Sequence, residues 1–132
     1  MKYMLDTNIC IYLIKKHPAS VMRHISQLSS DQLYISSITS SELFFGVYNS
    51  AFPQKNLNAL LQFLLPVTVL PYPPEASQEY GKIRADLKKR GQLIGPMDLL
   101  IATHAVYHGL VLVTNNTEEF SRVKKLKIEN WV

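Results

Sequence analysis

The chain has 132 residues with a net charge of +4, 47% apolar and 18% charged side chains, and a single cysteine. These numbers predict one packed domain over residues 1–132, and they exclude a disordered chain or one held together by disulfides. The best candidate for a membrane span, Leu57–Leu70, is broken by Gln62 and Pro66, and no secretion signal is evident, so we expect a cytoplasmic protein without membrane contact.

Apolar periodicity and turn residues predict strands that alternate with helices. In chain order, the expected elements are a strand at 2–5, helices at 7–14 and 18–28, a strand at 33–37, helices at 39–47 and 54–65, a strand at 67–70, helices at 75–90 and 96–107, a strand at 110–113, one helical turn within 114–120 and an edge strand at 126–131. Thr39 is placed to cap the helix that it opens, and Gly91 and Gly109 are placed to end the helices before them.

Strands that are joined through helices require parallel crossovers. The fold class that we expect is therefore α/β, a three-layer α/β/α sandwich with a central twisted, mainly parallel sheet. In such sheets, ligands bind beyond the carboxyl ends of the strands, where the strand order reverses. Asp6 follows the first expected strand, and Thr114, Asn115 and Asn116 follow the fourth.

Three acidic residues lie in apolar surroundings: Asp6, Glu42 and Asp98. A carboxylate buried without a partner is costly, so each must find a donor, a cation or a proton. Local explanations exist for each, namely Asp6 as a helix cap, Glu42 as half of a capping box with Thr39, and Asp98 as a charge near a helix N-terminus. Their shared edge of the sheet favours a hard divalent cation, Mg²⁺ or Mn²⁺, held by oxygen ligands.

The positive charge is concentrated in two segments. Five basic residues against Asp86 give residues 82–90 a net charge of +4, and four basic residues give residues 122–127 another +4, so the rest of the chain carries −4. Lysine and arginine bind phosphate backbones by releasing counterions, which favours a nucleic acid as partner, although such runs also occur on solvated helix faces. The candidate RNA-binding residues are Arg84, Lys88, Lys89, Arg90, Lys124 and Lys125.

Four segments of the sequence are similar to the PIN-domain ribonucleases and, among them, to the VapC toxins of bacterial toxin–antitoxin pairs. In chain order they are YMLDTNICIYLIK, SSITSSELFFGV, IRADLKKRGQLIGPMDLLIATHA and GLVLVTNNTEEFSRVKKLKIENW. The resemblance runs from Met1 to Val132 and keeps the family's order of motifs. It implies the same three-layer sandwich that the expected elements give.

The resemblance also implies a catalytic site. Asp6, Glu42 and Asp98 correspond to the family's acidic catalytic residues and metal ligands. Near the family's fourth acidic position this chain has Asn115 and Asn116, and Glu119 follows one turn later. We expect supporting roles for a further set of polar residues, several of which are equally explained as helix caps or turn residues: Asn116, Glu119, Thr7, Asn8 and Thr114.

By the same resemblance, the chain is expected to be a metal-dependent endoribonuclease toxin that cleaves structured RNA, with tRNA as the leading substrate. The implied partners are a cognate VapB-type antitoxin and a second copy of the chain, which forms a homodimer within the toxin–antitoxin complex. Operator DNA is expected to be contacted only through the antitoxin. Apolar side chains of the fourth expected helix are assigned to the core or to a subunit interface: Leu60, Leu61, Phe63, Leu64 and Leu65.

Two other functions and a zinc site compete with this interpretation. A catalytically silent RNA-binding PIN domain would work through its basic segments alone, although all three acids are intact. A phosphatase with Asp6 as nucleophile is disfavoured, because haloacid-dehalogenase enzymes have a second aspartate where this chain has Asn8. His104 and His108 are four residues apart on one expected helix, but they lie well round it from Asp98, so we expect packing or surface histidines.

Overall fold

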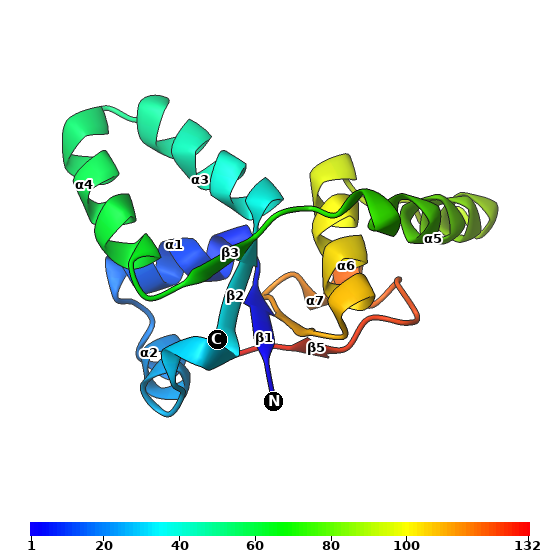
Figure 1. The fold of residues 1–132 in the computed structure, drawn as a ribbon, viewed down its shortest axis with the longest axis horizontal. Helices are drawn as coiled ribbons and strands as arrows, with labels where there is room; N and C mark the ends of the chain where they lie inside the picture. The colour runs from blue at the N-terminus through cyan, green and yellow to red at the C-terminus, as the bar shows by residue number, and fades with distance from the viewer.

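The computed structural model describes residues 1–132 and has a parallel sheet between two layers of helices (Figure 1). The strand order is β3-β2-β1-β4-β5, and every neighbouring pair is parallel. The strands are β1 (Tyr3–Leu5), β2 (Leu33–Ser36), β3 (Thr68–Leu70), β4 (Val111–Val113) and β5 (Ile128–Glu129). The expected α/β/α sandwich is confirmed, with a sheet that is parallel throughout.

Seven helices cover the two faces of the sheet. They are α1 (Thr7–Lys15), α2 (Ala19–Ser26), α3 (Ser37–Tyr48), α4 (Pro53–Leu64), α5 (Ser77–Lys89), α6 (Pro96–His108) and α7 (Thr117–Phe120). Helices α1 to α4 pack on one face and α5 to α7 on the other, and Figure 1 shows the two groups on opposite sides of the strands. Two 3-10 turns, η1 (Ser30–Gln32) and η2 (Pro74–Ala76), precede β2 and α5. No helix has the length and apolar character needed to span a membrane.

Two separate apolar cores of 12 buried residues each lie on the two faces of the sheet. They form because successive side chains of a strand point to opposite faces. In β1, Met4 belongs to the core with α5–α7 and Leu5 to the core with α1–α4, and Leu112 and Val113 of β4 divide in the same way. Strand β1 is therefore buried from both sides, which fixes the position of its carboxyl end.

The strand order reverses at β1, with β2 and β3 on one side and β4 and β5 on the other. Tyr3 pairs with Leu33 of β2 and with Val111 of β4, so three carboxyl ends lie next to one another. In parallel α/β sheets, this reversal opens a crevice beyond the strand ends. The residues that follow β1, β2 and β4 therefore meet at one edge.

The start of α3 differs from the sequence prediction. Strand β2 ends at Ser36, which pairs with Leu70, and Ser36 itself caps α3 by accepting a hydrogen bond of 3.1 Å from the backbone N–H of Ile38. Thr39 lies inside the helix, fully buried, and its hydroxyl has no hydrogen-bond partner. The predicted capping box between Thr39 and Glu42 is therefore wrong, which leaves the Glu42 carboxylate available for another contact.

The remaining boundaries agree with the prediction to within a few residues, except that β5 has only two. Gly91 and Gly109 end α5 and α6 with φ angles of 65° and 67°. This left-handed conformation costs glycine less than any other residue, which explains both stops.

Candidate active site

Asp6 follows β1 directly and caps α1. Its side chain is buried; Oδ1 accepts a hydrogen bond of 3.0 Å from the backbone N–H of Ile9, and Oδ2 accepts one of 2.5 Å from the hydroxyl of Thr114. Burial nevertheless raises the pKa of Asp6 above its usual value, because desolvation outweighs these hydrogen bonds. The helix cap is present, yet the carboxylate still lacks a positive partner.

Glu42 extends from α3 toward the start of α1. Its Oε1 accepts a hydrogen bond of 2.6 Å from the hydroxyl of Thr7, the first residue of α1. Glu42 also borders an apolar hollow of about 260 Å³ between α1, α3 and α4. Thr7 thereby ties the Glu42 carboxylate to the residue that directly follows Asp6.

Asp98 lies in the first turn of α6, with Glu119 of α7 beside it. A Cβ atom at Gly95 would lie 3.9 Å from both Asp98 Oδ2 and Glu119 Oε1. Glu119 accepts hydrogen bonds from the backbone N–H of Gly95 (2.9 Å) and from Asn116 Nδ2 (2.7 Å), and these donors hold its pKa below the usual range. In contrast, burial raises the pKa of Asp98 to about 6. The acids that add to this rise are Glu119, Glu42 and Asp6.

Four carboxylates from widely separated parts of the chain thus form one acidic patch: Asp6, Glu42, Asp98 and Glu119. The side chains that raise the pKa of Asp98 are all acidic, and no lysine or arginine acts on Asp6 or Asp98 to offset them. Arg122 acts on Glu119 alone, so the charge on Asp6 and Asp98 is not offset by the protein. A bound cation is the usual compensation at such a place.

The donor chemistry of the acidic patch fits a hard divalent cation. Its donors are carboxylate, hydroxyl and amide oxygens, which Mg²⁺ and Mn²⁺ prefer. No three His, Cys, Asp or Glu side chains stand close enough to hold one ion together; Thr7, Thr114 and Asn116 instead hold one carboxylate each. Mg²⁺ is bound in proteins through one or two carboxylates and keeps several waters, so this loose arrangement suits it.

Thr114 and Asn116 connect two of the acids. Thr114 is fully buried after β4, donates its hydroxyl proton to Asp6 and accepts a hydrogen bond of 2.9 Å from the backbone N–H of Asn116. The side chain of Asn116 in turn donates to Glu119. A chain of three hydrogen bonds therefore runs from Asp6 to Glu119.

Two other asparagines of the sequence pattern lie differently. Asn115 is exposed and its side chain contacts Asn130, away from the acidic patch. Asn8 is exposed, and it acts on Asp6 through its backbone N–H rather than through its side chain. The structure thus gives Asn116, the asparagine expected to have a supporting role, a contact within the acidic patch, and gives Asn115 none.

The sequence model of the PIN-domain family, described as "PIN domain", matches residues 3–126. The chain belongs to the PIN-domain family. Among its relatives, Ribonuclease VapC2 of Haemophilus influenzae is 45% identical over 132 residues, covering 100% of this chain and 99% of the relative. The tRNA(fMet)-specific endonuclease VapC of Shigella flexneri is 45% identical over 131 residues, covering 99% of this chain and 98% of that protein.

Solved structures of PIN-domain relatives match the whole fold. The toxin–antitoxin complex VapBC2 of Rickettsia felis, bound to a promoter DNA fragment, contains a chain with a TM-score of 0.93 and 40% identity that covers 100% of both chains. The DNA-bound VapBC complex of Salmonella typhimurium gives a TM-score of 0.92 at 42% identity, covering 100% of this chain and 99% of the other.

The two basic segments of this PIN domain meet in space. Lys125 pairs with Glu79 of α5 at 3.0 Å, and a polar hollow of about 220 Å³ lies between α5 and the segment after α7. Lys82, Lys124 and Lys125 line the hollow together with two acids. We call the joined area the basic surface; its exposed candidate residues are Arg84, Lys88, Lys89, Lys124 and Lys125.

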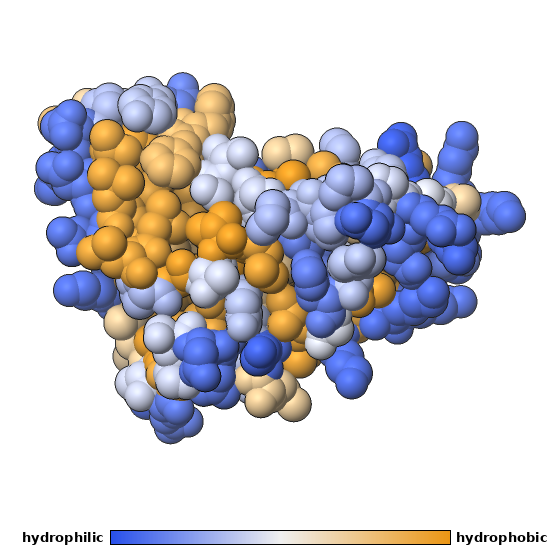
Figure 2. All heavy atoms as spheres, viewed as in Figure 1, coloured by the Kyte–Doolittle hydropathy of each residue, from blue (hydrophilic) through white to orange (hydrophobic).

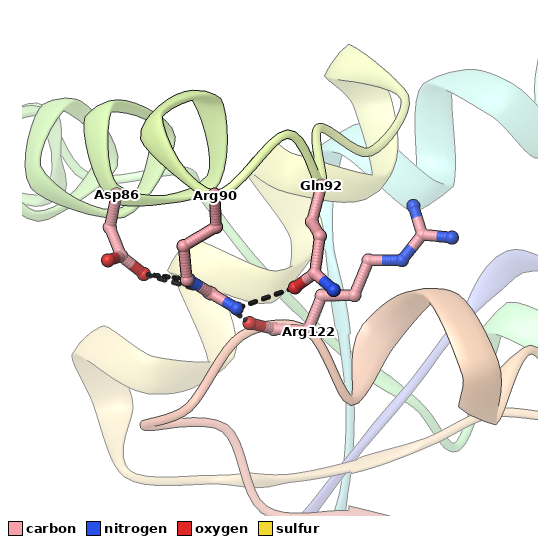
Figure 3. A network of polar contacts seen from close by, with 4 residues as sticks. All are labelled: Asp86, Arg90, Gln92 and Arg122. Carbon is pink, nitrogen blue, oxygen red and sulfur yellow. Dashed lines mark hydrogen bonds and ion pairs between the residues drawn. The ribbon is translucent and has the colours of Figure 1, made fainter.

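Arg90 differs from the other basic candidates because its guanidinium group is held within the protein. It contacts Asp86 through two nitrogens at 2.8 and 3.0 Å, Gln92 at 2.6 Å and the backbone carbonyl of Arg122 at 2.7 Å (Figure 3). The guanidinium of Arg122 donates in turn to the backbone carbonyl of Leu93. Arg90 therefore joins the end of α5 to the segment after α7.

Gly95 is the residue of the PIN-domain site that sequence reasoning missed. Its backbone N–H holds Glu119, and its backbone lies beside the carboxylates of both Asp98 and Glu119. The Gly-Pro pair before Asp98 marks a helix start in the sequence, but a local pattern does not say which distant side chain a backbone amide will meet.

Proposed function

We propose that residues 1–132 form a single PIN domain that acts as a Mg²⁺- or Mn²⁺-dependent endoribonuclease of a toxin–antitoxin pair. The observation that carries this proposal is the acidic patch at the strand-order reversal, where four carboxylates gather and neither Asp6 nor Asp98 is offset by a lysine or arginine. The names of the relatives, ribonuclease and tRNA(fMet)-specific endonuclease, support an RNA substrate.

Asp6 and Asp98 would hold the cation directly, and Glu42 would complete the site directly or through water. Thr7, Thr114 and Asn116 would orient the carboxylates, because each donates a hydrogen bond to one of them. When bound, the cation lowers the pKa of nearby water and neutralises charge on the phosphate. Attack in line by water on phosphorus, with loss of the 3′ oxygen, would leave a 5′-phosphate and a 3′-hydroxyl.

The basic surface would hold the RNA backbone. Its two parts meet at the hollow between α5 and the segment after α7, so lysines of both can contact phosphates of one folded RNA. A tRNA is the proposed substrate, by analogy with the relatives in Shigella flexneri and Salmonella typhimurium that are named for tRNA(fMet).

A cognate VapB-type antitoxin is the proposed inhibitor. Several neighbours of known structure are VapBC complexes, and two of these are bound to DNA, which supports operator contact through the antitoxin. The apolar hollow next to Glu42 suits an apolar stretch of such a partner, because Ile11, Ile14, Leu43 and Leu60 line it.

A homodimer within that complex would cover a further apolar surface. Figure 2 shows apolar side chains gathered over α3 and α4. Large exposed side chains in these helices, between them or directly after α4 are Phe45, Tyr48, Phe52, Leu61 and Leu65. A monomer rarely leaves a contiguous apolar area of this kind in water. Of the five residues assigned to core or interface, Leu60 is buried, whereas Leu61 and Leu65 are exposed.

The test is cleavage of total cellular RNA by the purified chain in Mg²⁺, with EDTA as the control and with mapping of new 5′ ends. We expect a defined set of cuts, concentrated in tRNA, that Asp6→Asn and Asp98→Asn abolish. Glu118→Gln is the matched control, since Glu118 is an exposed acid one position from Glu119. Binding of RNA without cleavage would instead indicate a catalytically silent PIN domain.

A further inference from the structure

A buried histidine joins α6 to the start of α3. His104 and Ser36 are both fully buried, and His104 Nδ1 lies 2.8 Å from the hydroxyl oxygen of Ser36. Ser36 ends β2 and caps α3, the helix that carries Glu42, whereas His104 lies in α6, the helix that carries Asp98. No other side-chain hydrogen bond links α6 to β2 or α3.

This contact connects the two helical layers through the end of a strand. Ile35 belongs to the core with α1–α4, and Tyr34 packs on the core with α5–α7. Because side chains alternate along a strand, Ser36 faces the same side as Tyr34, toward α6, although its backbone begins α3. The Ser36 hydroxyl therefore contacts both α3, in one helical layer, and α6, in the other.

Burial of His104 costs stability, because one of its two ring nitrogens is buried without a hydrogen-bond partner. That nitrogen is Nε2. Burial, with a smaller effect of His108, lowers the pKa of His104 to about 4, so the ring is neutral at neutral pH. Its other close neighbours are aromatic rings, Tyr72 among them. An apolar side chain would avoid the unpaired nitrogen, so the bond to Ser36 is the gain that the histidine brings.

The bond to Ser36 restricts geometry in a way that apolar packing does not. The Ser36 oxygen accepts from the N–H of Ile38 and also shares a hydrogen bond with His104 Nδ1, in which the tautomer of the ring sets the donor. A hydrogen bond is directional, whereas apolar burial is not. The contact therefore restricts both the rotation of α6 about its axis and its position along that axis, relative to the first turn of α3.

We infer that His104 is a positioning residue for the acidic patch, because through Ser36 it sets the spacing between Glu42 and Asp98. The inference rests on the proposed function, in which both carboxylates help to hold a divalent cation. Ser36 precedes Glu42 by six residues, and Asp98 precedes His104 by six. A small tilt of either helix at the contact thus moves a carboxylate.

Two matched pairs of variants in the full chain test this role. His104→Asn keeps an amide group near the place of Nδ1, and His104→Leu has a similar volume but no polar atom. Ser36→Thr keeps a hydroxyl that Ser36→Ala removes. Nitroxide labels at Ser41→Cys on α3 and Tyr107→Cys on α6, both exposed positions, report the distance between the helices, while buried Cys10 is shielded from the label.

We expect His104→Leu and Ser36→Ala to shift or broaden the label distance and to weaken Mn²⁺ binding by about tenfold or more, as for other residues that orient metal ligands. Both should lower kcat for RNA cleavage and leave KM unchanged, because the basic surface is intact. His104→Asn and Ser36→Thr should stay near wild type in all these measurements.

An unchanged label distance in His104→Leu and Ser36→Ala would overturn the inference, whatever their activity. If His104→Leu fails to fold, the Ser36 pair decides by the same measurement. A wild-type chain that neither binds Mn²⁺ nor cleaves RNA would refute the proposed function, and the label distance would still decide on His104.

Discussion

Thr114 donates its hydroxyl proton to Oδ2 of Asp6 across 2.5 Å, although the two residues are 108 positions apart in the chain. Strands β1 and β4 are adjacent and in register from Tyr3 with Val111 to Leu5 with Val113, so the residues that follow them meet at the edge of the sheet. The contact is buried, and it lowers the pKa of an acid whose burial raises it.

Replacing Thr114 with valine should therefore weaken the site at Asp6. Valine has the shape of threonine without the hydroxyl, so we expect the Asp6 pKa to rise further and Mn²⁺ affinity to fall by about 10–100-fold. Calorimetric titration with Mn²⁺ measures this. Thr114→Ser, which keeps the hydroxyl, is the control, and equal Mn²⁺ affinity in the valine and serine variants would contradict the role of the hydrogen bond.

Asp98 should make the metal-free protein less stable as pH rises. Its pKa of about 6 in the folded chain exceeds the ordinary 3.8, so the folded state binds the proton more tightly. The resulting stability is fully present below about pH 4 and is lost by about pH 6, with a ceiling of roughly 3 kcal/mol. Urea unfolding in EDTA gives the free energy of unfolding at each pH for wild type and for Asp98→Asn. If the difference between the two proteins does not change with pH, the prediction is refuted.

The two asparagines after β4 should differ in their effect on activity. Asn116→Ala removes a donor that holds Glu119, whereas Asn115→Ala removes only a contact with exposed Asn130. We expect the first to reduce RNA cleavage by about tenfold or more, within the range found for residues that orient metal ligands, and the second to leave it near wild type. Equal rates in single-turnover cleavage would show that Asn116 does not support the site.

Lys89 ends α5 and Arg90 caps it, and we expect alanine variants of the two residues to affect different properties, RNA binding and stability. Lys89 is exposed, so Lys89→Ala should weaken RNA binding with no loss of stability. The slope of log binding constant against log salt concentration should fall by about 1, the value for one lost phosphate contact. Arg90→Ala should instead lower the unfolding midpoint, since Arg90 contacts Asp86, Gln92 and the carbonyl of Arg122. RNA-binding titrations over a range of salt and thermal unfolding distinguish the two, and a reversed result would contradict the assignment.

Local patterns in the sequence were sufficient for the elements and for the acids. Short apolar runs and the Gly and Pro residues that bound them predict β1, α1 and α6 within a few residues, because the length of a run and its turn residues limit which element it can form. Asp6 and Asp98 stand out because a carboxylate in an apolar stretch needs a partner. Reversal of the strand order at β1 agrees with the expected crevice, since parallel crossovers place these strand ends together.

Only the tertiary structure decided which partner each group has. Ser36 and Thr39 are both able to cap a helix, and the pairing of Ser36 with Leu70 ends β2 at Ser36 and so selects it as the cap. Arg90 and Lys89 are equivalent in the sequence until the segment after α7 reaches one of them. The sequence by itself determined the order of elements and the acidic chemistry; hydrogen bonds between distant segments depend on strand register and helix packing, which no local pattern specifies.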